Sequence, residues 1–248
     1  MSLEPVLLVP DSHHPFHDKR AWYLMLEVGL AIKPKHVISM GDTVDFYGVS
    51  SHSRDPVRMS TTRFKREVEA GRNAIDELYC LGAKNNVFLL GNHEHRLLRY
   101  LMDKAPELYE LEELSIKNLL RLDKSTVIPY REDYKLGKLY VVHDIGVAGR
   151  YTPQRMLDAY GHNIVGGHTH RLSYIVEGNA AGDAHVSATF GWLGDRKKVD
   201  YMYKIRASKD WALGFGVAWL DTSNGNVHVQ PVPIVRYKCV VGGKEYSA

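Results

Sequence analysis

The sequence predicts a layered α/β fold, with parallel strands in its first half and a second, mixed sheet in its second half. Three observations predict it. Strand patterns alternate with helical patterns from Val6 to Leu90, a helical stretch follows from about Glu94 to Leu122, and strand patterns dominate from Val127 onward. A β-α-β-α-β alternation of this kind is typical of parallel strands that are joined by helices.

The strands of the first half are short runs of β-branched residues and leucine, at 6–9, 37–40 and 87–90. Two helices are expected between them. Asp18 is suited to cap the first, which runs through about Ile32 with a core face of Trp22, Met25, Leu26 and Leu30. Thr61 or Thr62 is suited to cap the second, whose core face comprises Phe64, Val68, Ile75, Leu78 and Tyr79. Cys80 falls in the same apolar pattern, and we expect it to be a small core residue.

In the rest of the chain, helical spacing over 94–122 is broken at Pro106, and strand patterns follow. These patterns lie at 139–142, 164–165, 174–177, 184–188, 215–220 and 227–232. Turn signals at Asn224-Gly225 and Gly242-Gly243 separate the later ones. We expect these strands to form the second, mixed sheet. The whole chain, residues 1–248, is predicted to be a single domain.

Composition narrows the class of protein. The chain is 44% hydrophobic and has a formal net charge of +3. The electrostatic field of the whole protein is therefore weak, which permits an acidic partner without requiring one. Cys80 and Cys239 are too few for a disulfide framework. No segment approaches the roughly 20 apolar residues that span a bilayer, and the N-terminal segment reads as a strand and not as a signal peptide. We therefore expect a cytoplasmic protein without a membrane partner.

Five short motifs follow apolar runs and supply carboxylates, imidazoles and one amide. They are Asp11-Ser-His13, Gly41-Asp42-Thr-Val-Asp45, Gly91-Asn92-His93-Glu94, Val142-His143-Asp144 and Gly167-His168-Thr-His170. A carboxylate can bridge two cations, while imidazoles and an amide oxygen fill other positions without adding negative charge. Two ions about 3.5–4 Å apart can bind the attacking and leaving oxygens of a phosphoryl group and lower the pKa of a shared water. The motifs therefore predict a site for two divalent metal ions.

In this order, from Asp11 to His170, the motifs resemble those of the calcineurin-like metallophosphoesterases. The resemblance implies a four-layer α/β/β/α sandwich of two mixed sheets flanked by helices. It also implies a metal-dependent phosphoric ester hydrolase. The implied metal ligands are Asp11, His13 and His170 for the first ion, Asp42 as the bridge, and Asn92, His143 and His168 for the second.

The resemblance also implies catalytic roles for His93 and Asp45. His93 would face the scissile phosphate and either protonate the leaving oxygen or hold transition-state charge. Asp45 would hydrogen-bond His93 and favour its cationic form, because a nearby carboxylate raises an imidazole pKa. Glu94 would support the site from the start of the following helix.

Departures from the family's better-known branches bear on the substrate. The protein serine/threonine phosphatase branch usually has Arg-Gly where this chain has Phe46-Tyr47, and the DNA-repair nuclease branch usually has Asp where this chain has Glu94. The runs PDSHHPFHDKRA, SSHSRDP and GNHEHRLLRYL look most like the metallophosphoesterases that bacteriophages encode. That likeness continues to PVPIVRYKCVV. It would place the protein in a host cytoplasm.

Several residues beside the motifs are candidates for substrate binding. Arg96 and Arg99 suit phosphate, although both also fit a solvated helix surface. Trp192 is followed by the basic residues Arg196, Lys197 and Lys198. An aromatic residue beside basic ones is typical of single-strand nucleic-acid sites. The alternative is that the Trp192 ring closes the core. His14, His17 and His95 lie next to motifs, and the loop after Asp45 holds Tyr47, His52, Arg54 and Arg58. His36, His162, His185 and His228 have no motif beside them and read as ordinary surface or core residues.

Three functions are compatible with these residues. The first is hydrolysis of phosphodiester bonds, in nucleic acid or nucleotides, by a metal-activated hydroxide with His93 assisting the leaving group. The second is a phosphomonoesterase acting on phosphoprotein or small phosphate esters, since the same ions serve both reactions. The third is a non-catalytic scaffold, which we expect to have lost ligands that this chain keeps. The mixed oxygen and nitrogen donors favour Mn²⁺, with Fe, Zn or Ni also suitable. The oligomeric state cannot be read from the sequence.

Overall fold

A computed structural model describes residues 3–50, 64–199 and 209–248. The expected helix caps Thr61 and Thr62, and the loop residues His52, Arg54 and Arg58, lie outside these ranges. The first sheet has the strand order β11-β10-β1-β2-β3-β4. Its strands are β1 (Leu3–Val9), β2 (His36–Ser39), β3 (Asn85–Leu89), β4 (Ser125–Ile128), β10 (Gly214–Asp221) and β11 (Val227–Pro233). Strands β1, β2 and β3 run parallel, as predicted, and β4, which was not predicted for this sheet, continues it in parallel.

The second sheet has the strand order β5-β6-β7-β9-β8. Its strands are β5 (Tyr134–Leu136), β6 (Leu139–Val142), β7 (Asn163–Gly166), β8 (Leu172–Gly178) and β9 (Ala184–Phe190). Strands β6, β7 and β9 run parallel, whereas β5 and β8 are antiparallel to their neighbours. This sheet is mixed, as expected. A separate hairpin of β12 (Lys238–Val241) and β13 (Lys244–Ser247) ends the chain.

The assignment of 215–220 and 227–232 to the second sheet was wrong. Strand β10 pairs antiparallel with β1, with Val6 opposite Ala218, and β11 pairs with β10. The physical reason lies in β1, whose four residues from Val6 to Val9 are all fully buried. An apolar strand of this kind needs a hydrogen-bonded partner along both of its edges. Strand β2 covers one edge of β1, and β10 covers the other. A strand pattern identifies a strand but not the sheet that it joins.

The helices cover the outer faces of the two sheets. They are α1 (Lys19–Ile32), α3 (Phe64–Tyr79), α4 (Asn92–Lys104), α5 (Ile116–Leu119) and α6 (Thr152–Tyr160), with short 3₁₀ turns η1 (Tyr47–Val49), η2 (Pro106–Leu108) and η3 (Glu112–Leu114). Asp18 caps α1 as predicted, accepting a hydrogen bond of 3.1 Å from the Ala21 backbone N–H. Helix α4 begins two residues before the predicted start and ends ahead of Pro106, where the break was expected.

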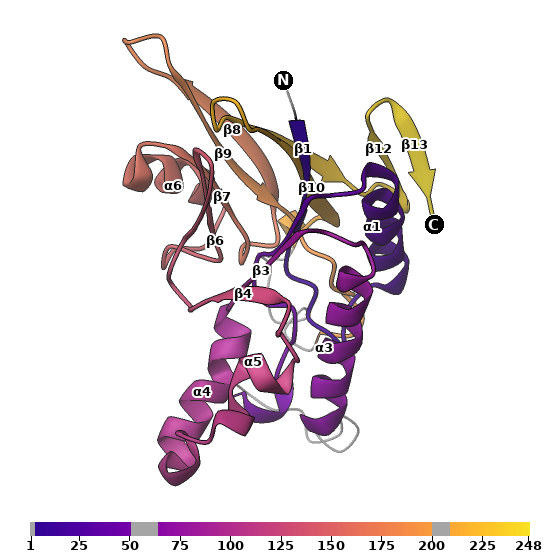
Figure 1. Cartoon of the computed structure of the whole chain (residues 1–248), viewed down its shortest axis with the longest axis vertical. Helices are drawn as coiled ribbons and strands as arrows, with labels where there is room; N and C mark the ends of the chain where they lie inside the picture. Colours follow the sequence, from indigo (N-terminus) through magenta and orange to yellow (C-terminus); the bar gives the residue numbers. More distant parts are fainter. Residues whose placement is uncertain (1–2, 51–63, 200–208) are drawn as a thin grey trace.

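Successive side chains of β1 point to opposite faces of the first sheet, which shows how the layers stack. Val6 and Leu8 pack between the two sheets, against residues such as Val141 and Phe190, while Leu7 and Val9 pack under α1. On the far face of the second sheet, Met156 of α6 joins another apolar cluster. Figure 1 shows α6 on one flank of the molecule and α1 and α3 on the other. The expected α/β sandwich of two mixed sheets flanked by helices is confirmed.

Two expected core residues are not in the core. Leu30 is 60% exposed, because it lies on the outward face of α1 with the exposed Tyr23, while Ile32 in the same turn packs against the core. Cys80 is exposed, because α3 ends at Tyr79 and Cys80 lies in the turn that follows. No helix in the described parts of the chain is both long and apolar enough to cross a membrane.

A matched pair of leucine substitutions tests this core. Leu8→Ala should lower the free energy of unfolding by about 2–5 kcal/mol, because it empties volume between the two sheets. Leu30→Ala should change it by no more than about 0.5 kcal/mol, since that side chain is largely in water. Urea denaturation of the two variants measures the difference. Equal losses would contradict the placement of Leu8 between the sheets.

Candidate metal centre

The five motifs meet at one end of the two sheets. The motifs that begin at Asp11, Gly41 and Gly91 follow β1, β2 and β3, while His143 and Gly167 follow β6 and β7. Strands β1, β2 and β3 run parallel to one another, as do β6 and β7, so each set of loops lies at the carboxyl ends of its own strands. Packing of the two sheets brings both sets together.

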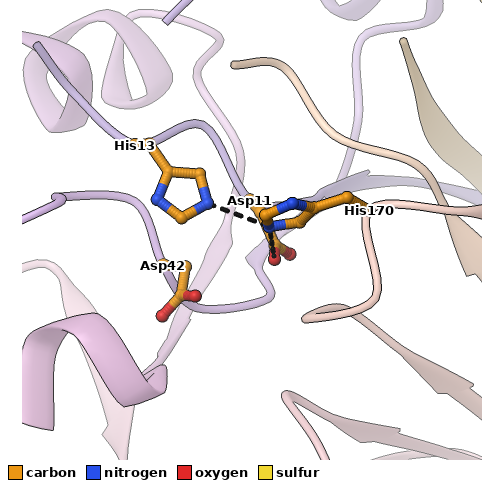
Figure 2. A group of neighbouring side chains, drawn as sticks. All are labelled: Asp11, His13, Asp42 and His170. Atoms are coloured by element: carbon orange, nitrogen blue, oxygen red, sulfur yellow. Dashed lines mark hydrogen bonds and ion pairs between the residues drawn. The ribbon is translucent and has the colours of Figure 1, made fainter. Parts of the chain in front are cut away.

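The first group of metal-ligating side chains comprises Asp11, His13, Asp42 and His170. Each offers one atom, and the four atoms lie within 4.8 Å of one another. His170 Nε2 is 3.0 Å from Asp11 Oδ2 and 3.0 Å from His13 Nε2 (Figure 2). All four residues are buried. The residues predicted for the first ion, together with the predicted bridge, therefore lie together.

The second group comprises Asp42, His143 and His168, with the Asn92 amide oxygen between the two imidazoles. Asn92 Oδ1 lies 3.1 Å from His143 Nε2 and 2.8 Å from His168 Nδ1. His143 Nε2 is also 3.4 Å from Asp42 Oδ1. Asp42 is thus the one carboxylate that both groups share, among the residues that the structure describes.

Hydrogen bonds behind two imidazoles fix the nitrogen that each presents to the site. His13 Nδ1 donates to Asp45 Oδ2 at 3.2 Å, and His143 Nδ1 donates to the Met40 carbonyl at 2.8 Å. A neutral ring that donates from Nδ1 keeps a lone pair on Nε2. Carboxylate or carbonyl support of this kind is typical of metal-binding histidines.

The donor set fits a divalent metal ion. Atoms that bind one ion at about 2.1 Å lie roughly 3–4 Å apart, which matches the closest contacts of the first group. The buried Asp11 Oδ2 has no hydrogen-bond partner, although His170 Nε2 lies close to it. Burial disfavours the charge of Asp42, but His143 and His93 hold its pKa well below the usual range, and Asp42 in turn raises the pKa of His143 to about 10. In the absence of a cation, a protonated His143 thus compensates the Asp42 carboxylate, and a metal ion bound at His143 Nε2 would displace that proton.

Four of these ligand residues have left-handed backbone conformations. The φ angles of His13, Asp42, His168 and His170 are 53°, 50°, 64° and 54°. A non-glycine residue in this region costs about 1–2 kcal/mol, so the surrounding contacts must hold it there. Clustering of such residues at a single site is typical of functional geometry.

Two glycines allow the loops to approach closely. A Cβ on Gly41, where φ is +94°, would lie 2.5 Å from His143 Nδ1. A Cβ on Gly91 would lie 2.1 Å from Asp42 Oδ1. Any side chain at either position would displace a residue of the site.

Glu94 holds the loop of Asp42 in place, as the supporting role predicted for it requires. Its carboxylate accepts backbone hydrogen bonds of 2.9 Å from Asp42, Val44 and Gly91. Burial and the nearby Asp42 carboxylate raise the pKa of Glu94 to about 7. One side chain therefore ties the loop after β2 to the start of α4.

The protonation state expected for His93 was wrong. Burial and the Arg96 guanidinium lower the pKa of His93, outweighing the carboxylates of Asp42 and Asp45. The Arg96 guanidinium donates to His93 Nε2 at 2.9 Å, which requires a lone pair on that nitrogen. The ring of His93 is therefore neutral, and Arg96, one helical turn further along α4, supplies the positive charge.

Asp45 has a wider role than the sequence predicted. His93 Nδ1 donates to the Asp45 backbone carbonyl at 3.0 Å and lies 3.4 Å from its carboxylate. The carboxylate also accepts from His13 and contacts Arg96 at 3.4 Å. His13, Asp45 and His93 are close enough to form a third metal-ligating group. Since both histidines use Nδ1 for these hydrogen bonds, the group is better described as a network that orients His13 and His93.

Sequence reasoning missed two residues that support the site. Buried Glu67 of α3 accepts backbone hydrogen bonds from Tyr47 at 2.5 Å and Gly48 at 3.0 Å, which anchors the turn after Asp45. The ring of Trp211 meets the ring of His170 at a centroid distance of 4.2 Å. Glu67 was detectable, because it is an acidic residue on the apolar face of its helix. Trp211 carried no signal in the sequence.

The candidates for substrate binding occupy different positions, and their roles stay predictions. Arg96 borders the site, whereas Arg99 is exposed further along α4. His14 is buried and stacks on His17 at 3.9 Å, while Tyr47 is buried beside Phe16. Trp192 is fully buried and stacks on the ring of His170 at 4.9 Å. Its ring therefore packs against a ligand instead of standing in a loop open to solvent.

The remaining candidates lie at the edges of the site or away from it. The ring of His95 packs on Tyr130 at 5.0 Å, and Asp144 accepts a 2.7 Å hydrogen bond from Gly146 N. Lys198 donates to the His17 carbonyl at 3.1 Å, and the Arg196 guanidinium donates to the Trp211 carbonyl. The four histidines without a motif lie outside the two metal-ligating groups: His36 pairs with Glu4, His162 and His185 contact each other, and His228 is exposed.

Comparison with known proteins adds little to this geometry. No protein family and no curated protein matches the chain. One crystal structure is similar over 93% of this chain and 99% of its own, with 10% identity and a TM-score of 0.42. The protein TT1561 of Thermus thermophilus is similar over the same shares, with 9% identity and a TM-score of 0.41. Likenesses this distant carry no argument about function.

The metal content of two variants should distinguish Asp42, which both groups share, from His168, which belongs only to the second group. Asp42→Ala should weaken binding in both groups, by roughly tenfold to a hundredfold or more, since losing even a residue that supports a ligand costs that much. His168→Ala should weaken only the second group. Equilibrium dialysis against Mn²⁺, followed by elemental analysis, gives the content of each variant. Equal losses in the two variants would contradict the shared position of Asp42.

Glu67 should make stability depend on pH. Burial raises its pKa from 4.5 to about 7, so the folded protein favours the protonated form. Stability from this group is fully present below about pH 4.5 and is lost as pH rises to about 7, with a slope of at most about 1.4 kcal/mol per pH unit. Urea denaturation in the presence of a chelator should show a flatter profile in this window for Glu67→Gln. The effect would be ruled out if the free energy of unfolding depended on pH equally in the wild type and in Glu67→Gln.

Proposed function

We propose that the protein is a metal-dependent phosphoesterase of the calcineurin-like class, hydrolysing phosphodiester bonds in nucleic acid or nucleotides. The observation that carries this proposal is the position of Asp42. Its carboxylate belongs to two groups of buried imidazole and carboxylate ligands at once. A carboxylate shared in this way is what a pair of adjacent cations requires, because it offsets their mutual repulsion.

The proposed ligands are the seven predicted ones. Asp11, His13 and His170 would hold one ion, Asn92, His143 and His168 the other, and Asp42 would contact both. Oxygen and nitrogen donors without thiolate favour Mn²⁺, and Fe, Zn or Ni would also suit them. Bound ions would polarise the phosphoryl oxygens and lower the pKa of water at the site.

His93 and Arg96 define the side of the site proposed for the leaving group. His93 Nε2 lies 3.7 Å from Asp42 Oδ2, so the ring borders the shared carboxylate. Its Nδ1 hydrogen bond to the Asp45 carbonyl fixes its orientation. We propose that His93 Nε2 orients the Arg96 guanidinium, and that this guanidinium holds the negative charge that develops on the leaving oxygen.

The charge balance near His93 favours a diester over a monoester. A phosphodiester carries one negative charge, whereas a monoester carries up to two near neutral pH. The ring of His93 is neutral, and the Arg96 guanidinium is already paired with Asp45. Next to His93, the protein therefore offers little uncompensated positive charge for a second phosphate charge.

Activity of a His93 variant tests this proposal. With Mn²⁺, the wild-type protein should cleave bis(p-nitrophenyl) phosphate faster than p-nitrophenyl phosphate. His93→Asn should lower kcat/KM for the diester by roughly 10²–10³-fold, as expected when stabilisation of charge on the leaving oxygen is lost. Its metal content should stay the same, because His93 is not among the proposed ligands.

His228→Asn is the matched control, since His228 is exposed on β11. It should retain wild-type rates. The proposal fails if the wild-type protein cleaves neither ester with any of Mn²⁺, Fe²⁺, Zn²⁺ or Ni²⁺. A His93→Asn protein that loses metal along with activity would instead assign His93 as a ligand.

A further inference from the structure

A cavity of about 350 Å³ has in its wall Arg171, which directly follows His170 of the candidate metal centre. It is bounded by the loop that leads into α6, by the start of β8 and by β9. Its polar side chains are those of Arg150, Tyr151, Arg171, Ser173, Thr189 and Asp210. Ligand pockets of proteins usually measure about 300–1,000 Å³, so this one suits a single small molecular unit.

The cavity is linked to the metal centre through two of its wall residues. Arg171 directly follows the ligand His170, and its guanidinium donates to the Thr169 carbonyl at 3.2 Å. Asp210 directly precedes Trp211, whose ring contacts the ring of His170. A substrate with its phosphate at the ligands could therefore extend its next group into this cavity.

The side chains of the cavity suit a nucleoside with an adjacent phosphate. Tyr151 is 70% exposed at the entry to α6, where its ring offers a flat apolar face to a base. Arg150 and Arg171 offer guanidinium groups, which match phosphate oxygens. The three groups combine a stacking surface with two cations, as nucleotide-binding surfaces do.

One unsatisfied hydroxyl and one carboxylate in the wall favour a polar ligand. The buried Thr189 Oγ1 has no hydrogen-bond partner among the described residues. Leaving such a hydroxyl unpaired costs about 1–3 kcal/mol, so a group that pairs with it gains that energy. The Asp210 carboxylate can accept hydrogen bonds from sugar hydroxyls or from an exocyclic amine. A purely apolar ligand would use neither group.

We propose that this cavity binds one nucleotide unit of the substrate, with the base against Tyr151 and a phosphate between Arg150 and Arg171. The proposal rests on the proposed function, because it assigns the substrate of the same centre to nucleotides and not to simple phosphate esters. Thr189 and Asp210 would supply hydrogen bonds to the sugar or base.

Calorimetric titration of the full chain measures this binding directly. The probes are adenosine 5′-monophosphate and inorganic phosphate, each with Mn²⁺ and again after chelation. Adenosine 5′-monophosphate should bind at least tenfold more tightly than phosphate, and it should still bind after chelation. Tyr151→Ala and Arg150→Ala should each raise its Kd by about tenfold. Both side chains are exposed, so neither substitution removes core packing.

Arg155→Ala provides the matched control, because Arg155 is an exposed arginine of the same helix that does not line the cavity. Its Kd for adenosine 5′-monophosphate should equal that of the wild type. Equal binding of the nucleotide and phosphate by the wild type would overturn the proposal, as would unchanged binding by Tyr151→Ala.

Failure of this proposal and failure of the proposed function give different results. A protein that cleaves bis(p-nitrophenyl) phosphate but does not prefer the nucleotide keeps the proposed function and loses the nucleotide site. The opposite result is a protein that prefers the nucleotide, with the expected losses in the variants, but cleaves no ester. That result supports the nucleotide site and rejects the phosphoesterase activity.

Discussion

Buried negative charge is the constraint on which the rest of this structure depends. Asp11, Asp42, Asp45 and Glu94 are all buried at the same end of the two sheets. Carboxylates removed from water are tolerated only when opposite charge or hydrogen bonds compensate them. Imidazoles, the Arg96 guanidinium and backbone N–H groups do so here. Metal ions would compensate the same charge, and two groups of these side chains are close enough together to hold one.

The same constraint accounts for the loop geometry. Ligand residues sit in left-handed conformations, and glycines stand where loops approach within contact of a ligand. Glu94 and Glu67 then secure the loop after β2 from two different helices. The backbone around Asp42 is thus held from both sides, and a shared ligand is the residue for which such precision matters most.

Residue chemistry at the ends of strands was sufficient to predict which side chains meet. Asp11, Asp42 and His143 each follow a buried strand, and parallel strands place their carboxyl ends together. The sheet joined by β10 could not be predicted, because pairing depends on contacts between residues that are distant in the chain. The neutral state of His93 depends on Arg96 and on burial, and burial is a tertiary property. Leu30 was misplaced because a leucine can occupy the outward face of a helix, and Cys80 because periodicity does not show where a helix ends.

The central position of β1 has a consequence for how the chain folds. Strand β1 ends at Val9, yet its partner β10 begins only at Gly214. During translation, one edge of the apolar segment Val6–Val9 therefore stays open until β10 has been synthesised. Native pairing over such a distance is slow, and an unpaired apolar edge invites association with other chains. Production of this protein should therefore benefit from chaperones and from slow synthesis at low temperature.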